Sequence, residues 1–500
     1  MNGPVSVMRA ADPTGAFSRR SARLVAFALV AASLGSLYYV LATTLFAHGF
    51  AAANLMFFGE KAELALHGMP PRLINLGFVY PPLSFLLLLP FGNPFVAQAA
   101  IAGVVIATLI QFLDRRPIDG RLRWLAKAYL IGSPLVLFET VEDYSALLFN
   151  VLFAFSVYWF ARYLDRRFSL DLFFAALLLA LTFFVDFRSM LAAVIVVPAM
   201  TLPFIRRSPS HALAIALAVA LPLGFFATAW MYVNWIFLGD ALAFVHGRGS
   251  FFRSFSHDPA LLLAAGNVGQ TVRATFAELA ATLPVTLPYF VGLICLRDRR
   301  APGGARLPQL ALYLAPVAVL GLSIYFGAYR SSFTLMTLFV FTFIVLLDRM
   351  YPSRWLTIAF ALALGTSFIV PAISAQTEER EFARGIYSAK VAPNLDEFRG
   401  LAAMLAGASP RARILTDDTD LFPLIYLIDA PERFILPYQY EFSSALSKPV
   451  AFARYVVVSR TSDDAIARLY PAVERGELPG FRELARTRRF IAFVRVGDEE

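Results

Sequence analysis

The sequence contains one cysteine, Cys295, and few charged side chains. A single cysteine cannot form a disulfide framework, a thiolate metal cluster or a dithiol redox pair within the chain. Charged residues make up 16% of the 500 residues, whereas a soluble protein of this size carries about a quarter. The low charge therefore argues against a soluble globular protein.

Nucleotide-binding motifs are also missing. The chain has no glycine-rich phosphate loop, no dinucleotide-binding fingerprint and no nucleophile-elbow sequence. These absences argue against an ATP-driven pump. If the protein performs chemistry outside the cytoplasm, its activated donor must already be present there, and a lipid-linked donor meets that need.

Apolar sequence is abundant instead. Hydrophobic residues account for 58% of the chain. Apolar runs of about 20 residues, each long enough to cross a bilayer, recur over residues 24–371. Arginine clusters separate many of these runs, which is the pattern of short cytoplasmic loops. The net charge of +9 therefore indicates membrane topology rather than nucleic-acid binding, and the chain is predicted to be an α-helical polytopic membrane protein.

The arginine distribution predicts about eleven spans, with a cytoplasmic N-terminus and an extracytoplasmic C-terminus. We expect a cytoplasmic tail at 1–22, a retained first span, and a transmembrane domain at 23–375 with outer loops at 47–92 and 239–275. For eight of these spans the apolar runs indicate both ends, at about 24–46, 93–113, 124–138, 144–164, 169–185, 211–237, 308–327 and 355–374.

The composition changes after about residue 376, where charges become frequent and apolar runs shrink to strand length. This predicts a small extracytoplasmic α/β domain at 376–500. Its predicted strands are 413–415, 455–459 and 490–496, and its predicted helices are 394–408 and the segment from the turn at 417–420 to about 428.

The first outer loop concentrates polar residues between two apolar runs. Residues 51–67 are predicted to form an amphipathic helix along the membrane interface, and four prolines then break the chain. The run at 81–91 is too short to cross a bilayer alone. Glu60 and Glu63 are three residues apart and so lie on one face of a helix. They are either a general base or metal ligands, or the polar face that an interfacial helix needs.

Two further groups of charges lie at outer helix ends. Glu139, Glu142 and Asp143 occupy the next outer loop, where they are either site residues or solvated acids, with Asp143 capping the fourth span. Asp186 and Arg188 lie where the fifth span meets the sixth. They form either an internal ion pair that stabilises a helical hairpin or part of a site.

Arg330 is isolated on an outer turn, and its planar fork suits phosphate recognition. Alternatively, the Arg330 side chain extends from the membrane interface so that its guanidinium lies in water. Arg72 is likewise interpreted as either a phosphate-binding or an interfacial residue. The histidines have no recognisable metal-ligand spacing and are interpreted as surface or loop residues; those weighed are His67, His246 and His257.

The first outer loop resembles that of the GT-C superfamily of integral-membrane glycosyltransferases, in particular bacterial members related to aminoarabinose transferases and protein mannosyltransferases. The matching residues are Gly59-Glu60, Leu66-His67-Gly68, Arg72-Leu73 and Tyr80-Pro81-Pro82-Leu83. Asp143 stands where relatives carry a second acid, and Tyr329-Arg330 resembles a turn that faces the lipid phosphate. Gly59 stands where relatives carry the first acid of an Asp-Glu pair, so Glu60 must take over its role.

The resemblance implies transfer of a sugar from a polyprenyl phosphate to a lipid, glycan or protein acceptor. The reaction would take place at the outer face of a bacterial cytoplasmic (inner) membrane. Glu60 would deprotonate the acceptor hydroxyl, and Asp143 would orient the acceptor or hold a divalent metal such as Mg or Mn. Arg330, with Arg72, would bind the leaving phosphate. The remaining residues expected to bind substrate are Glu63, Tyr80 and Glu142.

Two other classes of function stay open. A transporter would have polar groups near mid-span and broken helices in matching halves of the chain. The third class is a non-catalytic membrane protein in envelope polysaccharide assembly or export, and the glycine at position 59 keeps it in consideration.

Overall fold

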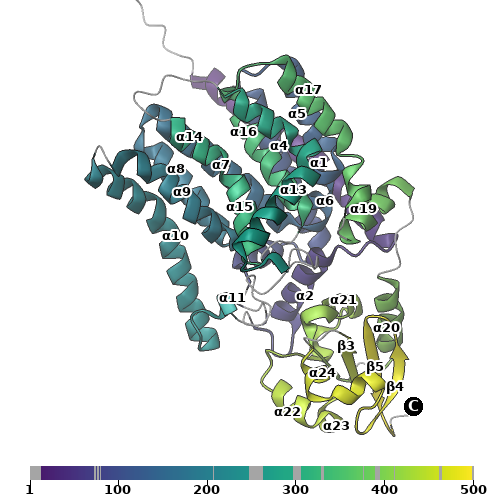
Figure 1. The fold of residues 1–500 in the computed structure, drawn as a ribbon. Helices are drawn as coiled ribbons and strands as arrows, with labels where there is room; N and C mark the ends of the chain where they lie inside the picture. Colours follow the sequence, from purple (N-terminus) through teal and green to yellow (C-terminus); the bar gives the residue numbers. More distant parts are fainter. Residues whose placement is uncertain are drawn as a thin grey trace, which may run out of the picture.

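The apolar runs fold into long helices that pack side by side, and the polar C-terminal region forms an α/β domain at one end of this bundle (Figure 1). The computed structural model describes residues 13–72, 75, 78, 80–205, 208–246, 263–296, 306–327, 331–374, 377–388, 395–409, 411–460 and 464–497.

The first half of the bundle contains α1 (Pro13–Ala47), α2 (Ala53–His67), α3 (Pro82–Leu88), α4 (Pro94–Asp114), α5 (Gly120–Gly132), α6 (Pro134–Glu142), α7 (Tyr144–Arg166), α8 (Ser169–Phe183) and α9 (Arg188–Ile205). The second half contains α10 (Pro209–Leu238), α11 (Ala243–His246), α13 (Val268–Ile294), α14 (Arg306–Tyr313), α15 (Ala315–Tyr325), α16 (Ser332–Leu346), η2 (Leu347–Arg349), α17 (Arg354–Thr366) and α18 (Val370–Ile373). Several helices begin with proline, which lacks the N–H that a first helical residue leaves unpaired anyway.

In the described part of the chain, six helices are long and apolar enough to span a membrane: α1 from Ser21, α4, α7, α10, α13 and α16 with its 3₁₀ extension. Four shorter apolar helices accompany them, namely α8, most of α9, α15 and α17. The predicted spans map onto these elements, but the count of about eleven is not confirmed.

Three predicted spans are interrupted. The run at 124–138 forms α5 and α6, which are separated at Ser133 because Pro134 starts a new helix. The run at 308–327 breaks at Leu314, again just before a proline-containing first turn, and the run at 355–374 divides into α17 and α18. The outer loop expected at 239–275 ends at Asn267, whose side chain caps α13.

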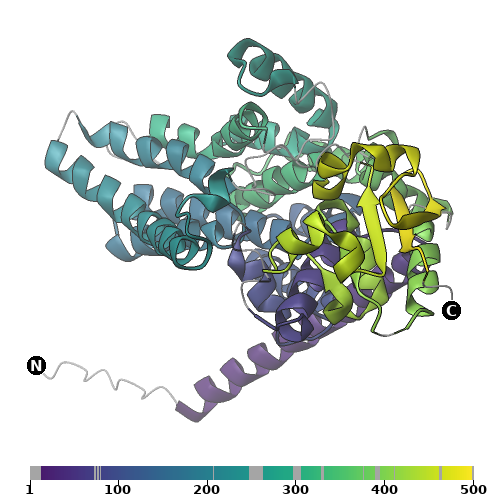
Figure 2. The same cartoon turned by 90° about the horizontal axis from the view of Figure 1, so that it is seen from below.

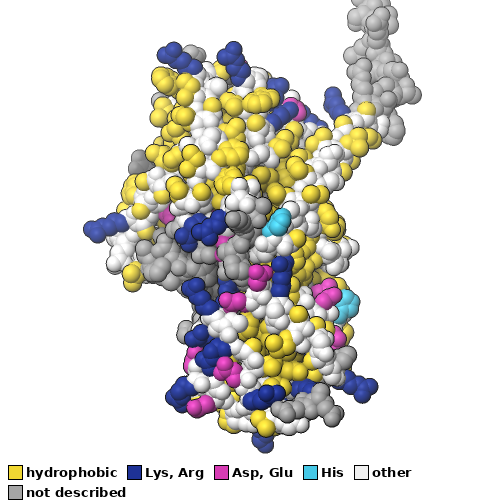
Figure 3. Space-filling model, turned by 90° about the vertical axis from the view of Figure 1, so that its right-hand side faces the viewer, with side chains coloured by type: hydrophobic (Ala, Val, Ile, Leu, Met, Phe, Trp, Pro, Cys, Tyr) yellow, Lys and Arg dark blue, Asp and Glu magenta, His cyan; other side chains and the backbone are white. Residues whose placement is uncertain are grey.

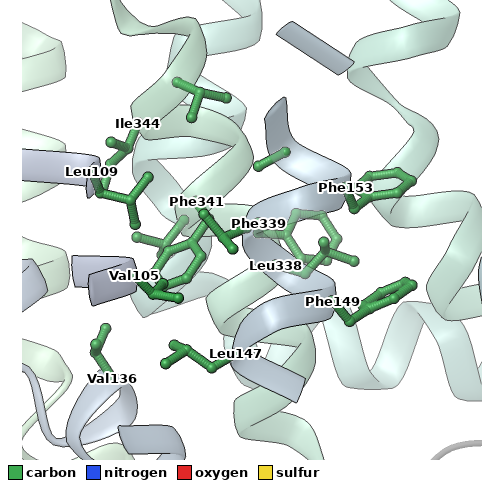
Figure 4. Close-up of a cluster of buried hydrophobic side chains, with 14 of the residues drawn as sticks. Val105, Leu109, Val136, Leu147, Phe149, Phe153, Leu338, Phe339, Phe341 and Ile344 are labelled. Atoms are coloured by element: carbon green, nitrogen blue, oxygen red, sulfur yellow. The ribbon is translucent and has the colours of Figure 1, made fainter. Parts of the chain in front are cut away.

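The bundle core lies where α4, α6, α7 and α16 meet. Its side chains are fully buried in a cluster of aliphatic and aromatic residues (Figure 4). The peripheral α1 packs mainly on α4, and a Cβ on Gly103 would lie 2.4 Å from the Ala31 carbonyl oxygen. Small residues of this kind let membrane helices approach closely.

The surface of the bundle is more apolar than that of the α/β domain, as the compositions of the two parts of the sequence predict. On the face drawn in Figure 3, hydrophobic side chains cover much of the bundle, Lys and Arg gather at its upper end, and charges of both signs cover the α/β domain. This distribution matches a bundle embedded in lipid with a solvated domain at one end.

The α/β domain is built on a five-stranded sheet of order β2-β1-β3-β5-β4. β1 (Ile414–Thr416) runs parallel to β2 (Phe434–Ile435) and β3 (Tyr455–Ser459), while β5 (Phe490–Arg495) pairs antiparallel with β3 and with β4 (Phe481–Arg486). Its other elements are α20 (Asp396–Ala406), α21 (Asp418–Ile428), η3 (Pro431–Arg433), α22 (Phe442–Ser447), α23 (Pro449–Phe452), α24 (Ala465–Leu469) and η4 (Pro471–Arg475).

Alternate strand residues face opposite sides of this sheet. Ile414 and Val457 pack with α20 and α21, whereas Leu415 and Val456 pack with α22, α24 and η4. The helix before the domain, α19 (Thr377–Ser388), lies on the bundle, where Phe382 packs among the core aromatic residues. Seen from below, the α/β domain lies over the side formed by α1 and α2 and leaves α8 to α10 uncovered (Figure 2).

Candidate functional site

α2 lies between the bundle and the α/β domain (Figure 1) and contacts α3, α4 and α6 on one side and α21 on the other. Most of its side chains are buried, including Asn54, Glu60 and Lys61. The helix predicted at 51–67 is confirmed, and its position along the membrane interface stays a prediction. The α/β domain contacts α2 at Lys61, whereas Asn54 faces acids inside the bundle.

The first polar cluster joins the two domains through Lys61. Its Nζ donates a hydrogen bond to Oδ2 of Asp418, in the first turn of α21, and lies 3.3 Å from Oε2 of Glu60. The rings of Phe57 and Tyr438 flank the ammonium, with centroids 5.4 and 5.1 Å from Nζ. The side chains of Glu60 and Lys61 are 0% and 3% exposed, so this is a buried ion cluster.

Burial raises the pKa of Glu60 to about 8, although the charge of Lys61 opposes the shift and that of Asp418 adds to it. Burial alone would lower the pKa of Lys61, but the charges of Asp418 and Glu60 outweigh it and raise that pKa. Apart from its ion pair, the Glu60 carboxylate accepts no hydrogen bond from the described residues. It is therefore a buried acid that exchanges its proton near neutral pH.

The second polar cluster lies at the N-terminal end of α2. The Asn54 side-chain amide donates to Oε2 of Glu142 at 2.9 Å and to Oδ2 of Asp143 at 3.1 Å, and its backbone N–H donates to Oε1 of Glu142. The other oxygen of Asp143 accepts the backbone N–H groups of Ser145 and Ala146, which confirms the predicted cap of α7. Both acids are buried, so the alternative of solvated loop residues is wrong.

Two amides inside apolar helices extend this second cluster. Gln98 of α4 bridges the Glu139 carbonyl and the Tyr144 backbone N–H, and Asn150 of α7 lies 3.3 Å from both carboxylate oxygens of Glu139. Sequence reasoning missed Asn54, Gln98 and Asn150. A polar amide inside an apolar run is the signal that could have identified the last two.

The predicted ion pair between Asp186 and Arg188 is confirmed. Arg188 Nε donates to Oδ2 of Asp186 at 2.7 Å, and the Arg188 backbone N–H donates to Oδ1 at 2.8 Å. The guanidinium also lies 5.0 Å from the Phe149 ring centroid and interacts electrostatically with Asp143 and Glu139. The pair thus closes the α8–α9 connection beside the acids of the second cluster.

Other predicted site residues lie apart from the buried clusters. Glu63 is half-buried and pairs with the exposed His67, with 2.8 Å between Oε2 and Nδ1. Residues three apart lie about 60° apart around a helix, so the two acids share one broad face, as predicted. They differ in burial and partner, because Glu60 is enclosed beside Lys61 whereas Glu63 pairs with an exposed histidine.

Tyr80 belongs to the first cluster, where its ring packs against Phe57 with centroids 4.9 Å apart and burial raises its pKa to about 12. Arg72 is exposed and stacks over Tyr440 of the α/β domain, 5.3 Å from the ring centroid. His246 pairs with Asp240 near the end of α10. Two predicted residues, Arg330 and His257, lie outside the described part of the chain.

No group of three or more His, Cys, Asp or Glu side chains among the described residues is arranged to hold a metal ion. Asp143, the expected ligand, already binds the Asn54 amide and caps a helix. These contacts do not fit a preformed divalent-metal site at Asp143.

Gly59 lies where the α/β domain approaches α2 most closely. A Cβ at this position would lie 2.8 Å from Cε2 of Tyr426, in α21, and 3.1 Å from Cγ of Pro94. Real Cβ atoms do not approach other atoms this closely, so the observed contact between α2 and α21 requires glycine. A longer acidic side chain would force Tyr426 away.

Comparison with known proteins found no matching family model and no matching curated protein sequence. A structural match is the crystal structure of ArnT from Cupriavidus metallidurans bound to undecaprenyl phosphate. It has a TM-score of 0.55 and 11% identity, and the match covers 92% of this chain and 98% of that chain. The chain is therefore a polytopic membrane protein with a fold like that of this ArnT structure, and it carries a small C-terminal α/β domain.

Proposed function

We propose that this protein is a membrane glycosyltransferase that moves a sugar from a polyprenyl phosphate to a lipid, glycan or protein acceptor. The main support is the position of α2, which holds a buried carboxylate beside a buried ammonium at the end of the bundle next to the α/β domain. The fold resembles that of ArnT, whose structure contains undecaprenyl phosphate. An acid and a cation in one enclosed site suit a reaction that releases a proton and a phosphate.

In the proposed reaction, the acceptor hydroxyl oxygen attacks the anomeric carbon of the donor sugar. The bond between that carbon and the phosphate oxygen breaks, and the polyprenyl phosphate leaves with the bonding electrons. Glu60 takes the hydroxyl proton, and Asp143 orients the acceptor. Arg330 and Arg72 stabilise the negative charge of the leaving phosphate, for which guanidinium groups are well suited.

Access to Glu60 is restricted because α21 and Tyr438 cover it. Enclosure helps a transferase, since water would otherwise compete with the acceptor for the donor sugar. We therefore expect the acceptor to reach Glu60 when the α/β domain moves away from α2, and the domain to close over the site again afterwards.

We further propose that the N-terminus is cytoplasmic and that the α/β domain faces the outer side of a bacterial cytoplasmic membrane. Lys and Arg gather at the end of the bundle opposite this domain (Figure 3), as expected for the cytoplasmic side. An epitope tag after residue 500 should be accessible from outside intact spheroplasts. A tag that becomes accessible only after lysis would contradict this orientation.

The decisive test is a transfer assay with a defined polyprenyl-phosphate sugar and the purified protein. Mass spectrometry of lipid that co-purifies with the protein identifies the donor, and the glycan profile of a deletion strain identifies the acceptor class. Glu60→Gln keeps the side-chain shape but removes the base, and it should reduce turnover by about 10²–10⁴-fold. The matched control is Glu63→Gln, which changes the same residue type one helical turn away.

Normal turnover by Glu60→Gln would remove Glu60 from the mechanism. Co-purification of the lipid without transfer to any acceptor class would favour the alternative of a non-catalytic protein in envelope polysaccharide assembly. Gly59 is the observation that keeps this alternative in view, because the position lacks an acid and an added side chain would displace Tyr426.

A further inference from the structure

The α/β domain supplies one member of the ion cluster from a rigid position. Asp418 is the first residue of α21, directly after β1, and Asp417 caps the same helix. The Asp417 carboxylate accepts the backbone N–H groups of Thr419 at 3.1 Å and of Ala465 at 2.9 Å. The turn that carries Asp418 is therefore fixed within its own domain before it meets α2.

Docking of the domain brings this turn onto α2. Tyr426 packs over Gly59, and the rings of Phe422 and Phe57 meet edge to face with centroids 5.5 Å apart. A further contact joins Arg399 to the Phe46 carbonyl oxygen at 2.6 Å. Asp418 thus reaches Lys61 as part of an extended interface, and its carboxylate shares that ammonium with Glu60.

We propose that Asp418 is a positioning residue of the transfer site: it competes with Glu60 for the Lys61 ammonium, and through this shared pairing and its own negative charge it sets the proton affinity of Glu60. The link to transfer rests on the proposed function. The link to Glu60 ionisation does not, because it follows from the ion cluster alone.

The cluster makes two predictions of opposite sign. Lys61 lies 3.3 Å from Glu60 and favours its ionised form, whereas the negative charge of Asp418 disfavours it. Removing the charge of Asp418 should therefore make Glu60 a stronger acid, and removing the charge of Lys61 should make it a weaker one. A charge within about 4–6 Å typically shifts a carboxyl pKa by about 1–3.

Other groups near Glu60 contribute little charge. Burial raises the pKa of both Tyr80 and Tyr438, so these two phenols stay neutral at physiological pH. Among the other elements packed on α2, α3 has no ionisable side chain, and the one ionisable side chain in α4, Asp114, is at its far end.

Of the charged residues on the two remaining elements, Glu432 of η3 is exposed to solvent, and the others are bound to groups other than Glu60. Glu142 of α6 binds Asn54, and Glu139 binds Asn150. Arg433 of η3 donates to the backbone oxygens of Leu405 and Ala412. Lys61 and Asp418 therefore dominate the electrostatic environment of Glu60.

The test follows the protonated carboxyl of Glu60 by infrared difference spectroscopy of the full-length protein, with neither donor nor acceptor present. Glu60→Gln identifies the band. Asp418→Asn should move its titration midpoint down by about one pH unit or more, and Lys61→Met should move it up. Asp420→Asn is the matched control, because it removes the same charge from the same helix turn at an exposed position and should leave the midpoint in place.

Equal midpoints for Asp418→Asn and Asp420→Asn would overturn the proposal, and so would an unshifted midpoint in Lys61→Met. If Asp418→Asn does not fold, Lys61→Met and Asp418→Glu still test the proposal. Asp418→Glu keeps the negative charge, so the Glu60 carboxyl should titrate near its wild-type midpoint. The pH profile of transfer is the second readout. Infrared shifts without a matching shift in that profile would support the ion cluster and reject Glu60 as the base.

Discussion

The two ends of α2 contact buried acids that are stabilised in different ways. At the N-terminal end, a neutral amide, Asn54, satisfies the buried acids Glu142 and Asp143 with hydrogen bonds inside the membrane bundle. One and a half turns further on, Glu60 lacks such donors and depends on Lys61, which also pairs with Asp418 of the other domain.

This difference separates acids that are held in one orientation from an acid that can react. Several hydrogen bonds within one rigid unit fix the orientation of a buried carboxyl group. A buried acid that depends on a shared ammonium at a domain boundary gains and loses its proton easily, and its environment changes when the domain moves. The Glu60 end of α2 is therefore the end at which we expect chemistry.

The largest expected contrast between the two ends is in pH dependence. If Glu60 is the base, transfer should fall about tenfold per pH unit below about 8, because only the ionised carboxylate accepts a proton. Turnover measured from pH 6 to 9 checks this. A flat profile would place the base elsewhere.

Stability should change with pH in the opposite direction. The pKa of Glu60 rises from its ordinary value of 4.5 to about 8 on folding, so the folded protein binds this proton more tightly. The resulting stabilisation is complete below about 4.5 and is lost as the pH rises to about 8. Burial also raises the pKa values of Glu379, Glu381 and Asp464, so the contribution of Glu60 is the part that disappears in Glu60→Gln.

Asn54→Ala tests the hydrogen-bonded end. It removes two side-chain donors from buried carboxylates, which should lower the free energy of unfolding by roughly 2–3 kcal/mol. Thermal unfolding in detergent measures the loss. Asn234→Ala is the control, since the amide of this buried asparagine donates only to Trp230 of its own helix. Equal losses in both variants would mean that Asn54 has no special role.

Gly59→Ala tests the contact between the domains. The added methyl group meets the Tyr426 ring, and overpacking of this kind costs roughly 1–3 kcal/mol. We expect faster proteolysis of the α/β domain and partial recovery when Tyr426→Ala is added. Gly400→Ala is the control in α20, where a Cβ meets no neighbour and favours the helix. If Gly59→Ala behaves like this control, the packing at position 59 does not determine docking.

The smallest effect is expected at the exposed pair on the same helix. His67→Ala breaks the contact with Glu63, and exposed pairs at this spacing contribute about 0.5 kcal/mol or less. Transfer and unfolding should both stay close to wild type. A large loss of transfer would indicate that Glu63 takes part in substrate binding.

Sequence patterns predicted the parts of the fold that depend on neighbouring residues. The bounds of α4 and α7 follow from apolar runs that end at arginines, and the cap by Asp143 follows from its place directly before α7. The Asp186–Arg188 pair is likewise local. In the sheet, β1, β3 and β5 were predicted. β2 was missed because it is only two residues long, and β4 was missed because charged residues hide its few apolar positions.

Contacts between distant segments could not be predicted in this way. Asp418 lies 357 residues after Lys61, and nothing in the local sequence of either residue indicates the other. The acidic turn at 417–420 was recognised as the start of a helix, but not as a partner for α2. Position 59 was recognised as unusual, yet its physical reason, the ring of Tyr426, lies in the other domain.

The 357-residue separation between Lys61 and Asp418 also matters during biosynthesis. At about 5–20 residues per second, a ribosome needs roughly 20–70 s to reach Asp418 after it has added Lys61. Until then, the Lys61 ammonium of the nascent chain can pair with Glu60 but not with Asp418.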